Sequence, residues 1–280
     1  MTQPPSPLVS TDEVASRLSD PDFVLVEVDE DTDAYAGGHI PGAIAFNWRT
    51  DLQDQLRRDF IGPDAFADLM ERSGIGNETR IVLYGGNNNW FAAYAYWYFR
   101  YYGHANVVLM DGGRKKWELE GRELTTDVAD VKAVAGYRTA GSDESIRALR
   151  DYVREFADSP GGALVDVRSP EEYRGELYAP AHLPQEAAQR PGHIPGAVNI
   201  PWSKSVDADT GAFLPKDQLE KLYADQGVVP SAEVVAYCRI GERSAHTWFV
   251  LHELLGFTNV RNYDGSWTEW GSLVGVPIER

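Results

Sequence analysis

The hexapeptide GHIPGA occupies residues 38–43 and occurs again, unchanged, at residues 192–197, which is 154 positions further along the chain. An Asp-Gly pair at residues 111–112 likewise returns at residues 264–265, at a separation of 153. These repeats divide the 280-residue chain into two copies of roughly 130 residues each. Solenoids are built from many shorter repeats, so two copies of this length indicate tandem domains.

The second copy is longer than the first in the stretch before its hexapeptide. The apolar run LVEV at residues 25–28 matches LVDV at residues 164–167, but these two runs are only 139 positions apart. The second copy therefore carries about 15 additional residues, which we expect around Leu177 to Arg190.

Each copy is expected to form an α/β domain, a mostly parallel sheet flanked by helices. Short apolar runs bounded by turn residues are typical of buried parallel strands. Three such runs occur in each copy, at 23–28, 81–84 and 107–110 in the first and at 163–167, 234–237 and 260–263 in the second. A helix is expected between the last two strands of each copy, at about 90–102 and 244–255, each ending at a glycine. This order implies right-handed crossovers between parallel strands.

The join between the copies is expected between Leu124 and Glu144, where apolar periodicity lapses and Thr, Asp, Gly and Ser accumulate. We therefore predict an N-terminal domain over residues 1–125, a linker over 126–144 and a C-terminal domain over 145–280. Residues 1–10 contain three prolines but neither a basic nor an apolar segment, so we expect a short lead-in and not a secretion signal.

Composition limits the classes of function. The formal net charge of −17 argues against nucleic acid and against anionic membrane surfaces as partners. No run of about 18 apolar residues is present to span a membrane. Cys238 is the one cysteine of the sequence, which excludes intramolecular disulfides and multi-cysteine metal sites and makes the reducing cytoplasm the expected location.

The segment CRIGERS, residues 238–244, lies between a predicted strand and a predicted helix. Ligand sites of open α/β sheets lie at such turns, beyond the carboxyl ends of the strands. Loop N–H groups, the helix dipole, and Arg239 and Arg243 if they point inward, all favour the thiolate of Cys238 over its thiol. Gly241 would let successive N–H groups converge on the sulfur, and two guanidinium groups suit a small anion. The segment therefore predicts a nucleophilic cysteine in an anion-binding loop.

The chain resembles the tandem-domain rhodaneses, or thiosulfate sulfurtransferases, over essentially its whole length. The loop at residues 238–244 satisfies every position of their pattern Cys-Arg-x-Gly-x-Arg/Lys-Ser/Thr, and the GHIPGA and Asp-Gly segments are also rhodanese-like. The loop and the HTWFV sequence at residues 246–250 are most similar to the actinobacterial type.

The resemblance implies sulfur transfer through a persulfide on Cys238, with no metal and no organic cofactor. Cys238 would attack the outer sulfur of thiosulfate and release sulfite, and cyanide or a thiol would then accept the sulfur. By this analogy Arg243 binds the small anionic donor, Arg239 supports it, and the loop N–H groups hold the charged persulfide. The rest of that loop consists of Ile240, Gly241, Glu242 and Ser244.

The first copy lacks the nucleophile. At a separation of 153, Gly85 corresponds to Cys238, and the chain has no other thiol, so we expect a non-catalytic N-terminal domain. Many relatives carry an arginine just before an aromatic residue in the segment that follows the first strand of the catalytic domain. Here Glu172 precedes that aromatic residue, and Arg168 and Arg174 flank the pair. Either arginine could reach the substrate, and Arg174 is kept as the candidate.

Several other conspicuous residues are expected to be structural. His39 and His193 occupy the same position of the two hexapeptides, only one of which belongs to a domain with a nucleophile. We therefore expect each histidine to hold a turn by a side-chain hydrogen bond. The aromatic-rich helix at residues 94–102 and Trp267 are expected in packing, and His246 is expected to be solvated or packed.

Three alternative functions stay open. 3-Mercaptopyruvate sulfurtransferases share the fold and the persulfide, but their loops have little basic character, whereas two arginines suit the thiosulfate dianion better. Cysteine phosphatases have a Cys-x5-Arg loop, and the spacing from Cys238 to Arg243 is one residue shorter. The third alternative is a non-enzymatic sulfur carrier or binding module.

Overall fold

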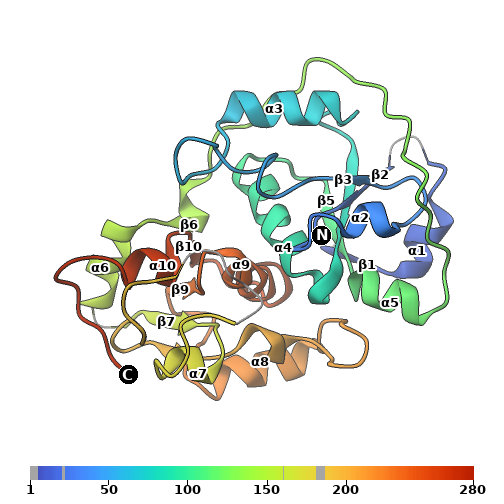
Figure 1. The fold of residues 1–280 in the computed structure, drawn as a ribbon. Helices are drawn as coiled ribbons and strands as arrows, with labels where there is room; N and C mark the ends of the chain where they lie inside the picture. The colour runs from blue at the N-terminus through green and yellow to red at the C-terminus, as the bar shows by residue number, and fades with distance from the viewer. Residues whose placement is uncertain (1–5, 21–22, 160, 181–186) are drawn as a thin grey trace. The chain divides into compact units, whose positions relative to one another are not determined.

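A computed structural model of the chain describes residues 6–20, 23–159, 161–180 and 187–280. The chain forms two compact units, coloured from blue to red along the sequence in Figure 1. Unit 1 comprises Met1–Asp143 and Asp207–Phe213, and unit 2 comprises Glu144–Val206 and Leu214–Arg280. The predicted lead-in at residues 1–10 and the predicted insertion around Leu177 to Arg190 lie partly outside the described residues.

Unit 1 contains a five-stranded sheet with the strand order β1-β5-β4-β2-β3. Its strands are β1 (Leu8–Val9), β2 (Phe23–Glu27), β3 (Ile44–Ala45), β4 (Arg80–Tyr84) and β5 (Val107–Met110). Its helices are α1 (Thr11–Ser16), α2 (Ala34–Gly37), α3 (Pro63–Arg72), α4 (Gly86–Tyr101) and α5 (Gly113–Leu119).

Unit 2 repeats this plan with the strand order β6-β10-β9-β7-β8. Its strands are β6 (Arg147–Ala148), β7 (Ala163–Asp166), β8 (Val198–Asn199), β9 (Val234–Tyr237) and β10 (Val260–Tyr263). Its α-helices are α6 (Arg150–Ala157), α7 (Pro170–Tyr173), α8 (Lys216–Ala224), α9 (Glu242–Phe249) and α10 (Ser266–Trp270), and a π-helix, Val250–Leu254, continues α9.

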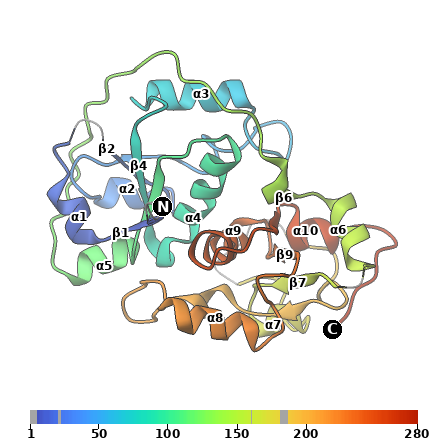
Figure 2. The same ribbon diagram turned by 180° about the vertical axis from the view of Figure 1, so that it is seen from behind.

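All pairings between these strands are parallel, and helices flank each sheet (Figures 1 and 2). The central strand of each sheet, β4 in unit 1 and β9 in unit 2, is a largely buried apolar run, as expected of parallel strands covered on both faces. The predicted fold of two tandem α/β domains is therefore confirmed. The four two-residue strands were not predicted, because two residues are too few to show a periodic pattern.

Both GHIPGA turns are held in the same way. His39 Nδ1 lies 2.8 Å from the carbonyl oxygen of Tyr35, and His193 Nδ1 lies 2.8 Å from that of Tyr173. Each imidazole also stacks on the ring of that same tyrosine. The structural role expected for the two histidines is therefore confirmed.

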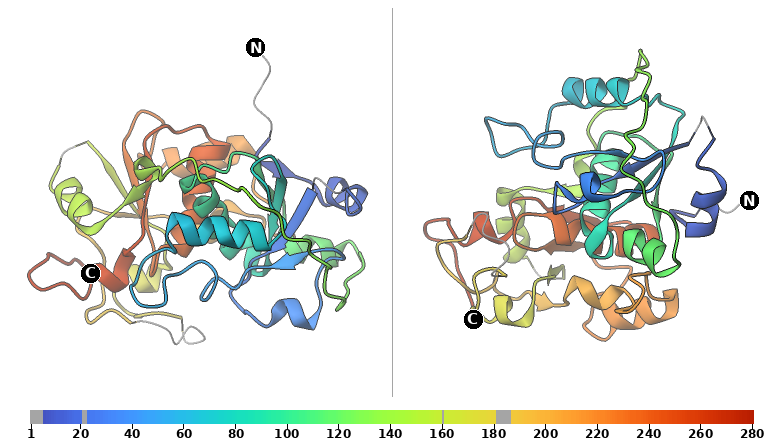
Figure 3. Two further views of the ribbon diagram at one scale, coloured as in Figure 1. Left: turned by 90° about the horizontal axis from the view of Figure 1, so that it is seen from above. Right: turned by 45° about the vertical axis from the view of Figure 1, so that its right-hand side comes forward.

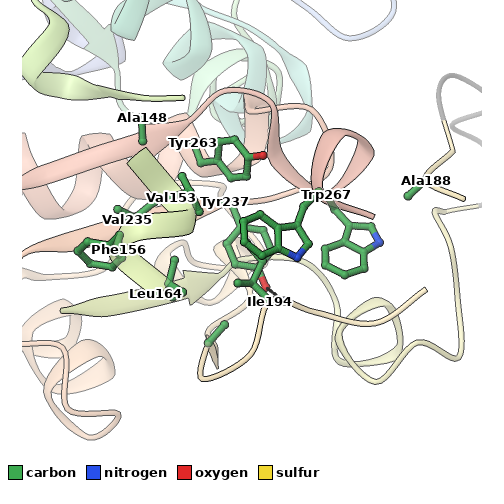
Figure 4. Packing of buried hydrophobic residues seen from close by; sticks show 12 residues of the cluster. Ala148, Val153, Phe156, Leu164, Ala188, Ile194, Val235, Tyr237, Tyr263 and Trp267 are labelled. Atoms are coloured by element: carbon green, nitrogen blue, oxygen red, sulfur yellow. Dashed lines mark hydrogen bonds between the residues drawn. The ribbon is translucent and has the colours of Figure 1, made fainter. Parts of the chain in front are cut away.

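The core of unit 2 is aromatic around the carboxyl ends of its strands. Figure 4 shows a cluster of buried residues that includes Tyr237, Tyr263 and Trp267. The Trp267 indole donates from Nε1 to the carbonyl oxygen of Arg190 at 3.1 Å, so its one polar atom is satisfied inside the core. Trp267 is a packing residue, as expected.

In unit 1 the aromatic side chains of α4 are buried and pack against one another and against neighbouring rings. Tyr94 contacts Tyr98 edge to face, and Phe60 packs on both Trp97 and Tyr98. The packing role expected for this helix is therefore confirmed within unit 1.

The first residues of α4 depart from a regular helix. Asn87, Asn88 and Asn89 all have positive φ angles, 45°, 57° and 61°, so the regular helix starts near Trp90, as predicted. Asparagine tolerates this left-handed conformation better than most residues because its amide bonds to nearby backbone. The equivalent helix in unit 2 begins at Glu242, two residues before the predicted start, because Gly241 ends the loop with a φ of 96°.

Residues 126–143 contain no helix or strand. In Figure 3 this segment runs alongside α3. Val134 N in the segment donates to the carbonyl oxygen of Glu71 in α3 at 2.9 Å. The boundary between the two units falls at Asp143, near the end of the predicted linker, and the predicted domain limits themselves stay a prediction.

Residues Asp207–Phe213 belong to unit 1 although they come late in the sequence. Phe213 N donates to the Asp111 carboxylate at 2.9 Å, and Lys115 Nζ donates to the carbonyl oxygen of Ala208 at 2.6 Å. No pattern in the sequence indicated this assignment.

Candidate functional site: a buried thiol between two arginines and two glutamates

Cys238 follows β9 directly, at the carboxyl end of a central strand, and its side chain is fully buried. The loop folds back over the sulfur, so that Gly241 N donates to Cys238 Sγ at 3.2 Å. Gly241 has a φ of 96°, and a Cβ atom at this position would lie 2.9 Å from the carbonyl oxygen of Asp264. Glycine is therefore required both by the left-handed backbone and by the close approach of the next strand end.

Hydrogen bonds to α10 and β10 fix the loop. Cys238 N donates to Ser266 Oγ at 3.0 Å, and the Cys238 carbonyl oxygen accepts from Trp267 N at 3.1 Å. Asn262 Nδ2 donates to the carbonyl oxygen of Gly241 at 2.8 Å, and Asn262 Oδ1 accepts from Ser244 Oγ at 2.6 Å. These contacts fix the Gly241 amide in position against the Cys238 sulfur.

Glu242, the first residue of α9, places its carboxylate against the thiol. Cys238 Sγ donates to Glu242 Oε2 at 3.1 Å, and the same oxygen accepts from Ile240 N at 3.1 Å. The other oxygen, Oε1, lies 3.8 Å from Arg243 Nε and 4.0 Å from Arg239 Nη2. We predicted Glu242 only as part of the loop backbone; its four-residue spacing from Cys238 across a helix start is the signal that could have indicated this contact.

The side chains of Arg239 and Arg243 are both almost fully buried. Arg243 donates to the Glu172 carboxylate twice, from Nη1 to Oε2 at 2.9 Å and from Nη2 to Oε1 at 3.0 Å. Glu172 lies on α7, where Ser169 forms a capping box with it. Sequence reasoning placed Glu172 beside a candidate arginine but missed its ion pair with Arg243, because the two are 71 residues apart.

Arg243 and Glu172 shift each other's pKa against the effect of burial. Burial is the largest single influence and lowers the pKa of Arg243, but the charge and hydrogen bonds of Glu172, together with the charges of Cys238 and Glu242, raise it on balance. Burial is the largest single influence and raises the pKa of Glu172, but the charge and hydrogen bonds of Arg243, together with Arg168 and the Ser169 amide, lower it on balance. Both groups are therefore charged, and the Arg243 charge is largely neutralised by its partner.

The expectation that the loop favours the thiolate is not met in the resting structure. Burial raises the pKa of the Cys238 thiol, and the nearby Glu242 carboxylate raises it further. Arg243 and the Ser244 hydroxyl act in the opposite direction but do not prevail. The sequence prediction counted the two arginines and not the two glutamates that neutralise them.

The remaining candidates are bound by other groups or act in packing. Arg174 is exposed and donates from Nε to Glu176 Oε1 at 2.8 Å. Arg168 is buried, donates from Nη2 to Asp166 Oδ2 at 2.6 Å and lies over the Trp267 ring. His246 is packed and not solvated, with its ring edge to face against Trp202.

The corresponding loop of unit 1 cannot hold a thiol in the same place. A Cβ atom at Gly85 would lie 2.2 Å from the carbonyl oxygen of Val28. Asn89, which takes the position of Glu242, bonds to the backbone on both sides, accepting from Gly85 N at 3.0 Å and donating to the Met110 carbonyl oxygen at 2.6 Å. This loop is closed by its own side chains.

Two absences among the described residues bear on the site. Among them, no group of three or more His, Cys, Asp and Glu side chains is placed to hold a metal ion. Within the same residues, no helix combines the length and the apolar character needed to cross a membrane.

Comparison with known proteins gives consistent results. The profile of the Rhodanese-like domain matches residues 10–120 and 149–273. Two actinobacterial proteins named "Putative thiosulfate sulfurtransferase" are similar along the chain: that of Saccharopolyspora erythraea is 59% identical over 97% of this chain and 95% of its own length, and that of Mycobacterium leprae 60% identical over 97% of each. The "Sulfur carrier protein TtuD" of Thermus thermophilus is 55% identical over 99% of this chain and 97% of its own length.

Among solved structures, an EanB variant with ergothioneine covalently linked to a cysteine persulfide superposes with a TM-score of 0.83 and 25% identity. The match covers 97% of this chain and 69% of that one. Another EanB complex with ergothioneine, at a TM-score of 0.79 and 26% identity, is covered over 64% of its length, so the present chain spans somewhat less than two thirds of it. With a matching profile in both halves and close relatives along its whole length, the chain belongs to the rhodanese family of sulfurtransferases, as two tandem rhodanese-like domains.

Proposed function

We propose that the chain moves sulfane sulfur from thiosulfate to cyanide or a thiol through a persulfide on Cys238. The observation that supports this most is the hydrogen bond from Gly241 N to Cys238 Sγ, 3.2 Å long, at the start of α9. A backbone donor fixed on the sulfur stabilises negative charge there without having to reorganise during the reaction. The persulfide named in the related EanB structure is in line with the same chemistry.

In this proposal the thiolate of Cys238 attacks the outer sulfur of thiosulfate. The bond between the two thiosulfate sulfurs breaks, and its electron pair leaves with sulfite, so that Cys238 carries a persulfide anion. An acceptor then attacks the terminal sulfur and restores the thiolate. Arg243 and Arg239 attract the anionic donor. The loop formed by Ile240, Gly241, Glu242 and Ser244 surrounds the charged sulfur, and the amide of Gly241 donates to it. Unit 1 takes no part in the chemistry.

A second donor, 3-mercaptopyruvate, is favoured by one observation. Glu172 and Glu242 neutralise much of the charge of Arg243 and Arg239, which weakens the case for a dianion over a singly charged donor. A sulfur-carrier role also stays a candidate, because of the likeness to the Thermus protein of that name. The cytoplasm stays the proposed location, on the single cysteine alone.

The test compares thiosulfate, 3-mercaptopyruvate and a phosphotyrosine analogue as substrates, with Cys238→Ser as the control. Cyanide-dependent turnover of thiosulfate that is lost in the variant supports the proposal. A higher kcat/KM for 3-mercaptopyruvate, or release of phosphate, overturns the choice of donor or of reaction class. Loading without turnover, seen by intact mass as about 32 Da on the chain, indicates a carrier.

A further inference from the structure

The thiol of Cys238 and the carboxylate of Glu242 form a buried donor–acceptor pair. The distance from Sγ to Oε2 is 3.1 Å, and both side chains are fully buried. The short loop between them is closed by two amides, since Ile240 N donates to Glu242 Oε2 and Gly241 N donates to Cys238 Sγ. Each member of the pair thus has a backbone donor that can stabilise a negative charge on it.

Other charged groups around the pair are already partnered. Arg243 is bound by Glu172 of α7, and Asp264, beside Gly241 at the end of β10, is bound by Arg147 at 2.6 Å. Arg239 faces Glu242 Oε1 at 4.0 Å. The surroundings therefore support one negative charge on the pair more readily than two, and burial raises the cost of a second.

We propose that Glu242 is a catalytic base that takes the thiol proton of Cys238. The O–H bond forms on Glu242 as the S–H bond breaks, so that the negative charge passes from carboxylate to sulfur and the total charge is unchanged. The inference rests on the proposed function for its donor. When thiosulfate arrives, it meets one thiolate and a neutral carboxylic acid instead of two anions.

The transfer also resolves the conflict between the pKa of the thiol and its role. A proton released to solvent would leave two adjacent buried negative charges, which burial and Glu242 itself oppose. A proton passed to Glu242 avoids that state. The thiol can therefore be protonated at rest and still react as a thiolate.

Glu242→Gln distinguishes a catalytic base from a purely electrostatic role, because the two roles predict opposite changes in the alkylation rate of Cys238. A glutamine cannot take the proton. If Glu242 is the base, iodoacetamide alkylation of Cys238 near pH 6 is slowed about tenfold or more in Glu242→Gln, and the two rates converge at alkaline pH. If Glu242 only repels the thiolate, its removal lowers the thiol pKa, and the variant reacts faster than the wild type near pH 6, with the two rates converging only at alkaline pH. That outcome overturns the inference.

Alkylation suits the question because the chain has one cysteine and the reagent is neutral. It also separates the two proposals: slowed alkylation in a chain that does not use thiosulfate supports the base and defeats the proposed donor. If the wild type turns over thiosulfate but Glu242→Gln is alkylated faster than the wild type, the proposed donor is supported and the catalytic base is contradicted. Glu253→Gln, at the far end of the same helical run, is the matched control and should alkylate as the wild type does.

Glu242→Asp covers the case in which the glutamine variant does not fold. It keeps a carboxylate but draws it back from the sulfur by one methylene. We expect a rate near pH 6 between those of Glu242→Gln and the wild type, and a rate above the wild type contradicts the inference.

Discussion

Arg243 and Glu172 form a bidentate ion pair in which both side chains are buried and both hydrogen bonds are 2.9–3.0 Å long. The pair joins α9, which follows the Cys238 loop, to α7 on another part of unit 2. It therefore serves both the stability of the unit and the charge near Cys238.

Glu172→Gln is expected to lower the free energy of unfolding by about 3–5 kcal/mol, because it leaves a buried guanidinium without its counter-charge. Urea unfolding measures the change. Glu176→Gln, which removes the exposed partner of Arg174, is the control and should unfold as the wild type does. If Glu172→Gln changes the free energy of unfolding as little as Glu176→Gln does, the stabilising role of the pair is contradicted.

Because the pKa of Cys238 is raised in the folded chain, stability should fall as the pH becomes alkaline. A folded-state pKa above the unfolded one contributes stability that is present below the unfolded value, about 8.5, and is lost as pH rises through the folded value. The unfolding free energy of the wild type should therefore fall relative to that of Cys238→Ser above about pH 8.5, by up to about 1.4 kcal/mol per pH unit. Paired urea titrations from neutral to alkaline pH test this, and a constant difference between the two chains would rule it out.

Gly241→Ala is expected to lose most sulfurtransferase activity and about 1–3 kcal/mol of stability, because the added Cβ atom meets Asp264 and moves the amide that contacts the sulfur. Gly256→Ala is the matched control: its φ of 75° is also left-handed, but nothing lies within 4 Å of the added atom. It should lose stability and keep its activity. Equal activity losses in both variants would assign the effect to backbone strain alone.

Arg174→Ala is expected to leave kcat/KM for thiosulfate within about twofold of the wild type, because Arg174 is exposed and bound to Glu176. Arg243→Lys should lower the same constant about tenfold or more, since a lysine cannot reproduce the bidentate geometry. Steady-state kinetics with thiosulfate measure both. A larger loss for Arg174→Ala would restore it as a substrate-binding residue.

Unit 1 is expected to resist conversion into a second active domain. Gly85→Cys, made in a Cys238→Ser background, should show no turnover and a lowered melting temperature, because its Cβ atom would lie 2.2 Å from the Val28 carbonyl oxygen. Gly37→Cys, where nothing lies within 4 Å, adds a thiol to the same unit without that clash and should leave the melting temperature unchanged. Persulfide formation at position 85 would contradict the expectation.

Much of the fold and the place of the active loop could be predicted because they rest on local signals. The hexapeptide, the apolar strands and the glycine at position 241 each determine the backbone of their own short segment. The electrostatic balance could not be predicted in the same way. The partner of Arg243 comes from a helix 71 residues earlier, and the effect of Glu242 depends on its rotamer at the start of α9. Counting arginines in a motif therefore could not predict how easily the thiol ionises.

The seven residues Asp207–Phe213 have a practical consequence for anyone who divides this protein. Because they pack with unit 1 while the chain on either side of them belongs to unit 2, one cleavage after Asp143 does not yield two intact halves. The N-terminal fragment would lose the backbone partners of Asp111 and Lys115, and the C-terminal fragment would carry a detached loop. To make unit 2 alone, residues 207–213 would have to be removed and Val206 linked to Leu214.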